Sequence, residues 1–198
     1  MCKMRNRILL LACLTLIFYI PSQSFQRDET AEEYKVYSAI LKAEHQADKP
    51  KTIVIIKRTS ENRPILPGSD DQKDILKALS PLTQETLMSY NSRNAAQTEL
   101  GVNKFDFIAK VALLNADEIS EIFHREGLRD SWKAFYQKFS DSGGVIKLSR
   151  VGFAFDTSQA LIFVSHYCGA LCASGTYYLL IKENGEWKVK REQLIWLS

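Results

Sequence analysis

The last third of the chain carries four segments with the residue pattern of β-strands, and these constrain the fold more than any other feature. Short runs rich in turn residues separate them. The last such run, Asn184-Gly185, is a strong signal for a two-residue hairpin. Consecutive strands with short links predict an antiparallel meander. The four segments are Val145–Phe153, Gln159–Tyr167, Thr176–Lys182 and Trp187–Leu197.

Helical patterns occupy most of the chain before these strands. An acidic start and an apolar face predict a helix between Asp28 and Pro50. Asn115 followed by Glu118 has the spacing of a helix cap. Two more helical segments flank Ser80-Pro81, and a last one opens at Asp130. Its bulky aromatic face, which we interpret as packing on the sheet, consists of Trp132, Phe135, Tyr136 and Phe139.

Thr52–Ile56 is a short β-branched run without alternation, which is typical of a strand buried on both faces. Residues 102–114 fit either a strand or a helix. Helices first and antiparallel strands last predict an α+β domain. We expect N-terminal helices packed on one face of a C-terminal four-stranded antiparallel meander, with one additional buried strand near residues 52–57.

The N-terminus has the pattern of a secretory signal peptide. Lys3, Arg5 and Arg7 precede an apolar run from Ile8 to Ile20, and small residues follow it. The run is shorter than a membrane-spanning helix needs. We therefore predict a signal peptide over residues 1–24, cleaved after Ser24, and a single domain over residues 25–198. The mature protein would be exported to the periplasm or the medium without a membrane span.

Charge argues against a nucleic-acid partner. The chain has 26 Lys and Arg and 23 Asp and Glu, and residues 1–24 contain three of the basic residues and none of the acidic ones. The predicted mature chain therefore carries 23 of each. A nucleic-acid binder normally has a basic surplus on its surface.

Cys168 and Cys172 are the two cysteines outside the predicted signal peptide. Export to an oxidising compartment, and glycines on either side of the loop, favour a disulfide between them. Thiol redox chemistry lacks the usual C-x-x-C spacing at a helix start. A metal site with His166 would need a further ligand, such as His45 or His124, and nothing in the sequence brings either one close. We expect no cofactor.

Four residues are candidates for ligand binding: Arg150, His166, Tyr167 and Tyr178. Arg150 can bind an anion, or it can pair with a nearby acid. Helices over an antiparallel sheet often leave a cavity, and strand aromatics would either line it or fill the core. The aromatics in question are Tyr167, Tyr177, Tyr178, Trp187 and Trp196.

A set of C-terminal segments resembles a group of exported bacterial proteins with no assigned activity. These segments are the aromatics Trp132, Phe135, Tyr136 and Phe139, followed by Leu148–Phe153, Gln159–Leu161, Cys168-Gly169, Gly175–Leu180 and Gly185–Val189. This resemblance covers roughly the last 70 residues and implies export, without implying any catalytic residue. The order of helices followed by strands is also similar to nuclear transport factor 2-like folds. Those folds host both enzymes and binding modules.

The sequence carries none of the common phosphate-binding, hydrolase or metalloprotease motifs. We therefore expect a non-catalytic binding or interaction module, with a protein or a small molecule as its partner. The alternative is a small-molecule enzyme that uses a cavity between helices and sheet.

Overall fold

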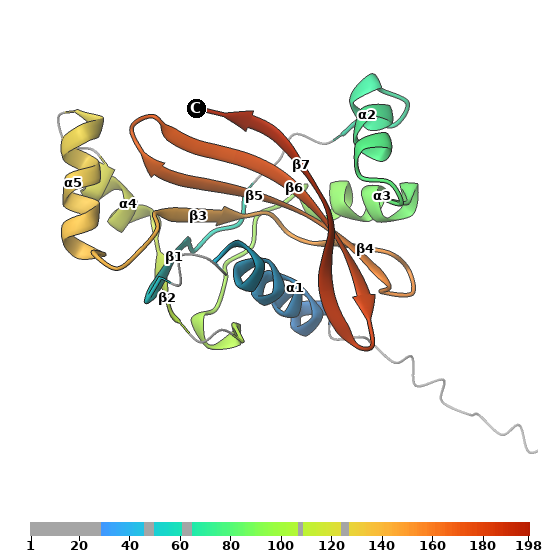
Figure 1. The fold of residues 1–198 in the computed structure, drawn as a ribbon, viewed down its shortest axis with the longest axis horizontal. Helices are drawn as coiled ribbons and strands as arrows, with labels where there is room; N and C mark the ends of the chain where they lie inside the picture. Colours follow the sequence, from blue (N-terminus) through green and yellow to red (C-terminus); the bar gives the residue numbers. More distant parts are fainter. Residues whose placement is uncertain (1–28, 46–49, 61–64, 107–108, 124–126) are drawn as a thin grey trace, which may run out of the picture.

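A computed structural model describes residues 29–45, 50–60, 65–106, 109–123 and 127–198. Within these ranges five α-helices and a seven-stranded mixed sheet form an α+β structure, which confirms the expected class (Figure 1). The helices are α1 (Glu29–Glu44), α2 (Asp70–Ala78), α3 (Gln84–Arg93), α4 (Ala116–Phe123) and α5 (Leu128–Lys138). The strands are β1 (Thr52–Ile56), β2 (Lys110–Leu114), β3 (Val145–Leu148), β4 (Gly152–Phe153), β5 (Gln159–Gly169), β6 (Cys172–Glu183) and β7 (Glu186–Leu197).

The sheet is not the four-stranded antiparallel meander that the sequence predicted. Its order is β2-β1-β3-β5-β6-β7, with β4 paired to β5. β1 runs parallel to both β2 and β3, whereas the strands from β3 onward pair antiparallel. The expected buried strand is therefore correct as β1, and the ambiguous segment contributes a further strand, β2. The β6–β7 hairpin turns at Asn184 and Gly185, both with positive φ, as predicted.

The predicted strand over residues 145–153 breaks in the middle, into β3 and β4. Asn94 of the α3 C-terminus bonds the backbone of Arg150 on both sides, at 2.8 Å to its N–H and 2.9 Å to its carbonyl. The N–H of Val151 donates to the Glu33 carboxylate at 2.9 Å instead of to a neighbouring strand. Tertiary hydrogen bonds thus replace the ladder at these residues.

The helices cover both faces of the sheet, so the expectation of one covered face is wrong. α1 packs on the face that carries Ile162 and Val164 of β5. The opposite face, which carries Leu161 and Phe163, packs against α2 and α3. α4 and α5 cover the far end of that second face, over Val54 and Val145 (Figure 1). β5 is buried from Gln159 to Ser165 because helices lie on both sides of it.

The helix starts were predicted in part. Asn115 and Glu118 cap α4 reciprocally, with N–H to oxygen distances of 2.9 and 3.1 Å, as predicted. α3 begins later than Ser80-Pro81 suggested, because the Thr83 side chain caps it by accepting from the N–H of Thr86.

Hydrogen bonds to the Glu32 carboxylate link α1 to the β6–β7 hairpin. Its carboxylate accepts from Lys182 at 2.8 Å, from Trp187 Nε1 at 3.0 Å and from Lys35 at 2.7 Å. Burial alone would raise the pKa of this carboxyl, but these hydrogen bonds outweigh burial and lower the pKa to about 2.

The predicted signal peptide, residues 1–24, lies outside the described residues. Among the helices that the structure does describe, none has the length and apolar character needed to cross a membrane.

Candidate functional site

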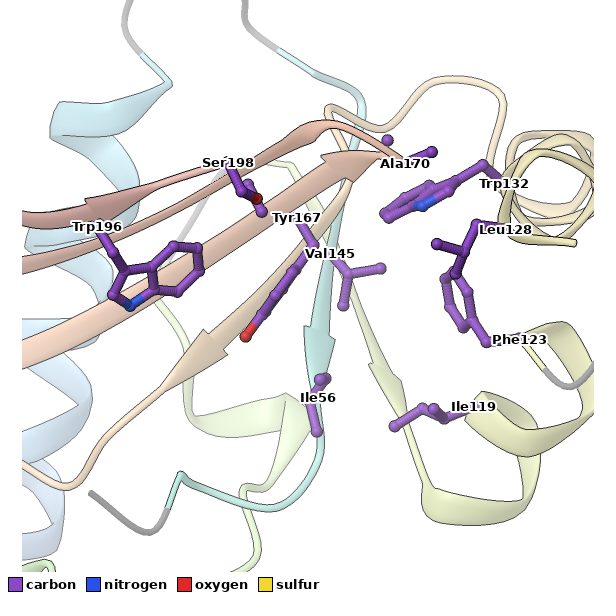
Figure 2. Close-up of a pocket in the computed structure, with 12 residues that line it drawn as sticks. Ile56, Ile119, Phe123, Leu128, Trp132, Val145, Tyr167, Ala170, Trp196 and Ser198 are labelled. Atoms are coloured by element: carbon purple, nitrogen blue, oxygen red, sulfur yellow. The ribbon is translucent and has the colours of Figure 1, made fainter. Parts of the chain in front are cut away.

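The two helix pairs on the second sheet face leave an apolar groove beside α4 and α5. It has a volume of about 380 Å³. One wall comes from the sheet and the other from the helices, and the tip of the β5–β6 hairpin closes one side (Figure 2). The lining residues are Ile56, Ile119, Phe123, Leu128, Trp132, Val145, Tyr167, Gly169, Ala170, Ala173, Trp196 and Ser198.

The helix wall is held in place by an aromatic cluster. The Trp132 ring lies 5.1 Å from Phe123 and 5.3 Å from Phe135, centroid to centroid, in edge-on contacts. Phe135 is fully buried, so the interpretation of the α5 aromatic face as core is correct for this residue. The hydroxyl of Tyr136 donates to the Cys168 carbonyl at 2.9 Å and ties α5 to the hairpin. Trp132 itself is only partly buried and faces the groove (Figure 2).

The sheet wall is formed largely by Tyr167 of β5 and Trp196 of β7. Their ring centroids are 6.0 Å apart, and both side chains are partly exposed. Of the strand aromatics that the sequence placed at a possible cavity, these two line the groove. The other three, Tyr177, Tyr178 and Trp187, belong to the buried clusters.

The Cys168–Cys172 pair shapes the hairpin tip. The two sulfur atoms lie at bonding distance, with Cα atoms 5.1 Å apart, as the predicted disulfide requires. Gly169 and Ala170 inside this loop line the groove, so the bridge constrains one of its walls. No group of three or more His, Cys, Asp or Glu side chains in the described ranges could hold a metal ion. His124, one of the further ligands considered, lies outside those ranges.

His166 and Tyr178 lie on the other face of the sheet, beneath the end of α1. Nε2 of His166 is 2.8 Å from the Gly143 carbonyl oxygen. The Tyr178 hydroxyl donates to Glu44 at 2.6 Å. Burial raises the pKa of Glu44, and burial together with the Glu44 charge raises that of Tyr178. The space between the described side chains of His45 and His166 does not admit a water molecule.

Arg150 is part of a buried ion cluster and not of the groove. Its Nη2 lies 3.3 Å from the carboxylate of Glu33, and Nη2 of Arg93 lies 2.9 Å from the same oxygen. Glu33 is 5% exposed. Of the two interpretations of Arg150, pairing with an acid is therefore the one that the structure supports, although the acid is buried.

A wider depression of about 700 Å³ lies between α1 and the β6–β7 hairpin. The lysines along it already have acidic partners: Lys35 pairs with Glu32, Lys42 with Asp106, and Lys188 with Glu183. Its surface is much more polar than that of the groove. We take the groove as the candidate site because concave apolar surfaces are the usual ligand sites of proteins.

The sequence analysis named Tyr167 and Trp196 among the aromatics that could line a cavity, but it named no residue of the helix wall as a candidate. Ile119 and Phe123 have the spacing of a buried face of α4, and Trp132 belongs to the aromatic face that was interpreted as core. Leu128 at the start of α5 also belongs to this wall, and its exposure, 63%, is visible only in the structure.

Comparisons with known protein families, with curated proteins and with solved structures found no match to this chain. The resemblances to exported bacterial proteins and to nuclear transport factor 2-like folds therefore stay predictions.

Proposed function

We propose that this protein is an exported, non-catalytic binding domain, and that the groove beside α4 and α5 takes an apolar ligand. One observation carries the proposal. Two aromatic walls enclose about 380 Å³ between them, a size in the range of small-molecule sites, which run from about 300 to 1,000 Å³. Trp132 and Trp196 face this space from the helices and from the sheet.

The chemistry of the lining favours binding over catalysis. Among the described residues that line the groove, no side chain carries a carboxylate, imidazole, amine or thiol. Acid–base and nucleophilic mechanisms depend on such groups within hydrogen-bond reach of the substrate. Glu44 and Tyr178, whose pKa values are raised, belong to the opposite face. The alternative, an enzyme with a cavity between helices and sheet, is thus less well supported, because the described side chains that line this groove include no carboxylate, imidazole, amine or thiol.

Export is supported by the signal-peptide pattern of residues 1–24 and by the Cys168–Cys172 pair, because disulfides persist in oxidising compartments. An apolar groove on an exported domain suits a carrier or a receptor for a poorly soluble compound.

The test is a fluorescence titration with the uncharged apolar dye N-phenylnaphthylamine. Ala170→Trp places an indole ring inside the groove from the hairpin tip, and we expect it to weaken dye binding about tenfold or more. Leu171→Trp is the matched control, because Leu171 is the next residue, is 89% exposed and does not line the groove. Equal affinity of the two variants and the wild type, or no dye binding at all, would overturn the proposal.

A further inference from the structure

Lys147 lies on the sheet face that forms the sheet wall of the groove. On β3 it is two residues from Val145, so both side chains point to the same face. On the neighbouring strand its partner is Ser165, and that of Val145 is Tyr167. Val145 and Tyr167 line the groove. Lys147 and Ser165 therefore form the next row of side chains, about 7 Å further along the same face.

This row separates the groove from the part of the face that α2 and α3 cover. Phe163, two residues before Ser165, already packs with the α2–α3 cluster. Ser165 itself is 5% exposed. Lys147 and Ser165 are not themselves lining residues, so this polar row lies just beyond the edge of the groove that is remote from α5.

Lys147 has no ion-pair partner in the part of the chain that the structure describes, although its side chain is partly buried. The hydroxyls of Ser165 and Tyr167 likewise make no hydrogen bond to the described residues. Most lysines in this position find an acid or extend fully into water, because a partly buried ammonium loses hydration. One cation and two hydroxyls without partners among the described residues thus lie along the edge of an apolar groove.

We infer that the ligand is a single-chain anionic amphiphile, such as a fatty carboxylate. Its head group pairs with the Lys147 ammonium and accepts from the Ser165 and Tyr167 hydroxyls. Its hydrocarbon tail lies between Tyr167 and Trp132. The inference rests on the proposed function, since it names the ligand class of the same groove. A charge-assisted pair at one end fixes the orientation of the ligand, and tail burial supplies most of the affinity.

Calorimetric titration of the full mature chain tests the inference with three probes of equal tail length: dodecanoate, dodecanol and dodecyltrimethylammonium, each below the concentration at which it aggregates. We expect dodecanoate to bind with one-to-one stoichiometry and about tenfold more tightly than dodecanol. Decanoate, two methylenes shorter, should bind roughly tenfold more weakly than dodecanoate.

Lys147→Met should reduce the affinity for dodecanoate to that for dodecanol, and Lys147→Glu should favour the cationic probe. Lys190→Met is the matched control, because Lys190 is an exposed lysine on the outer strand β7 that has no ion pair among the described residues. It should leave all affinities unchanged. Equal binding of dodecanoate and dodecanol to the wild type would overturn the inference, as would a carboxylate preference that survives Lys147→Met.

N-phenylnaphthylamine separates this inference from the function on which it rests. The dye is uncharged, so its binding to the wild type and to the Lys190→Met control reports on the groove without any contribution from the head-group pair. Normal dye binding without any carboxylate preference would overturn the ligand class alone. If the wild type binds neither the dye nor dodecanoate, the groove is not a binding site, and the proposed function and the ligand class are both overturned. Binding of dodecanoate only as part of lipid vesicles would contradict a site for a single free molecule.

Discussion

Replacing Glu33 by glutamine removes the carboxylate from the buried ion cluster between α1 and the sheet. One oxygen accepts from the Tyr37 hydroxyl at 3.0 Å and from the Val151 N–H at 2.9 Å. The other pairs with Arg93 and Arg150. Glutamine has nearly the same shape, but it leaves both guanidinium groups without their carboxylate. Because the two arginine side chains are only 14% and 23% exposed, water replaces that partner poorly.

The expected cost is large. Removing one partner of a buried ion pair typically lowers the free energy of unfolding by about 3–5 kcal/mol. The partial exposure of the arginines places Glu33→Gln at the low end, about 3 kcal/mol. For a domain of this size the melting temperature should fall by roughly 6–12 °C. Urea denaturation followed by circular dichroism measures the change directly, provided that the slope with urea stays constant.

Glu99 provides the matched control. Its carboxylate also meets two cations, Lys57 at 2.9 Å and Arg58 at 3.9 Å, but it is 55% exposed. Glu99→Gln should leave the free energy of unfolding unchanged within error, because exposed ion pairs contribute little. Adding Arg150→Met to Glu33→Gln should recover part of the lost free energy of unfolding, because it removes one of the two buried positive charges that have lost their carboxylate. If Glu33→Gln is as harmless as Glu99→Gln, the reasoning from burial is refuted.

Three further predictions concern the rest of the fold. A Cβ at Gly152 would overlap the backbone of Tyr90, so Gly152→Ala should lower the free energy of unfolding by about 1–3 kcal/mol in urea denaturation. The pKa of Glu32 is about 2 in the folded state, below its unfolded value, so its stabilising effect is complete above about pH 4.5 and is lost as the pH falls towards 2. Thermal melts over that range should show a steeper acid loss for the wild type than for Glu32→Gln. Replacing Cys168 and Cys172 together by serine should cost at most about 2 kcal/mol, because the loop is short, yet it should weaken N-phenylnaphthylamine binding measurably, because the loop walls the groove.

The sequence predicted the features that depend on a few neighbouring residues. The Asn115–Glu118 cap, the Asn184-Gly185 hairpin and the buried strand at Thr52–Ile56 are all present. Each is determined by local hydrogen bonding, backbone conformation or apolar content, so its signal lies within a short window.

The features that depend on distant partners were missed. The strand over residues 145–153 breaks because Asn94 and Glu33 form hydrogen bonds with its backbone. The sequence of that segment gives no sign of these two distant partners. The two-sided covering of the sheet is a property of helix placement, which apolar periodicity alone does not determine. The groove lies where the helices leave part of the sheet uncovered. Tyr167 could be named as a candidate because it lies on a strand, whereas Trp132, on the opposite wall, could not be distinguished from a core residue.

The indole N–H signals of the three tryptophans test the central claim most directly. Trp132 and Trp196 line the groove, whereas Trp187 is buried under α1 with its Nε1 bonded to Glu32 at 3.0 Å. Nitrogen–proton correlation spectra recorded during titration with N-phenylnaphthylamine should show the signals of Trp132 and Trp196 moving together to saturation, while that of Trp187 stays in place. A ligand that moves Trp187, or that binds without moving Trp132 and Trp196, would contradict the assignment of the groove as the binding site.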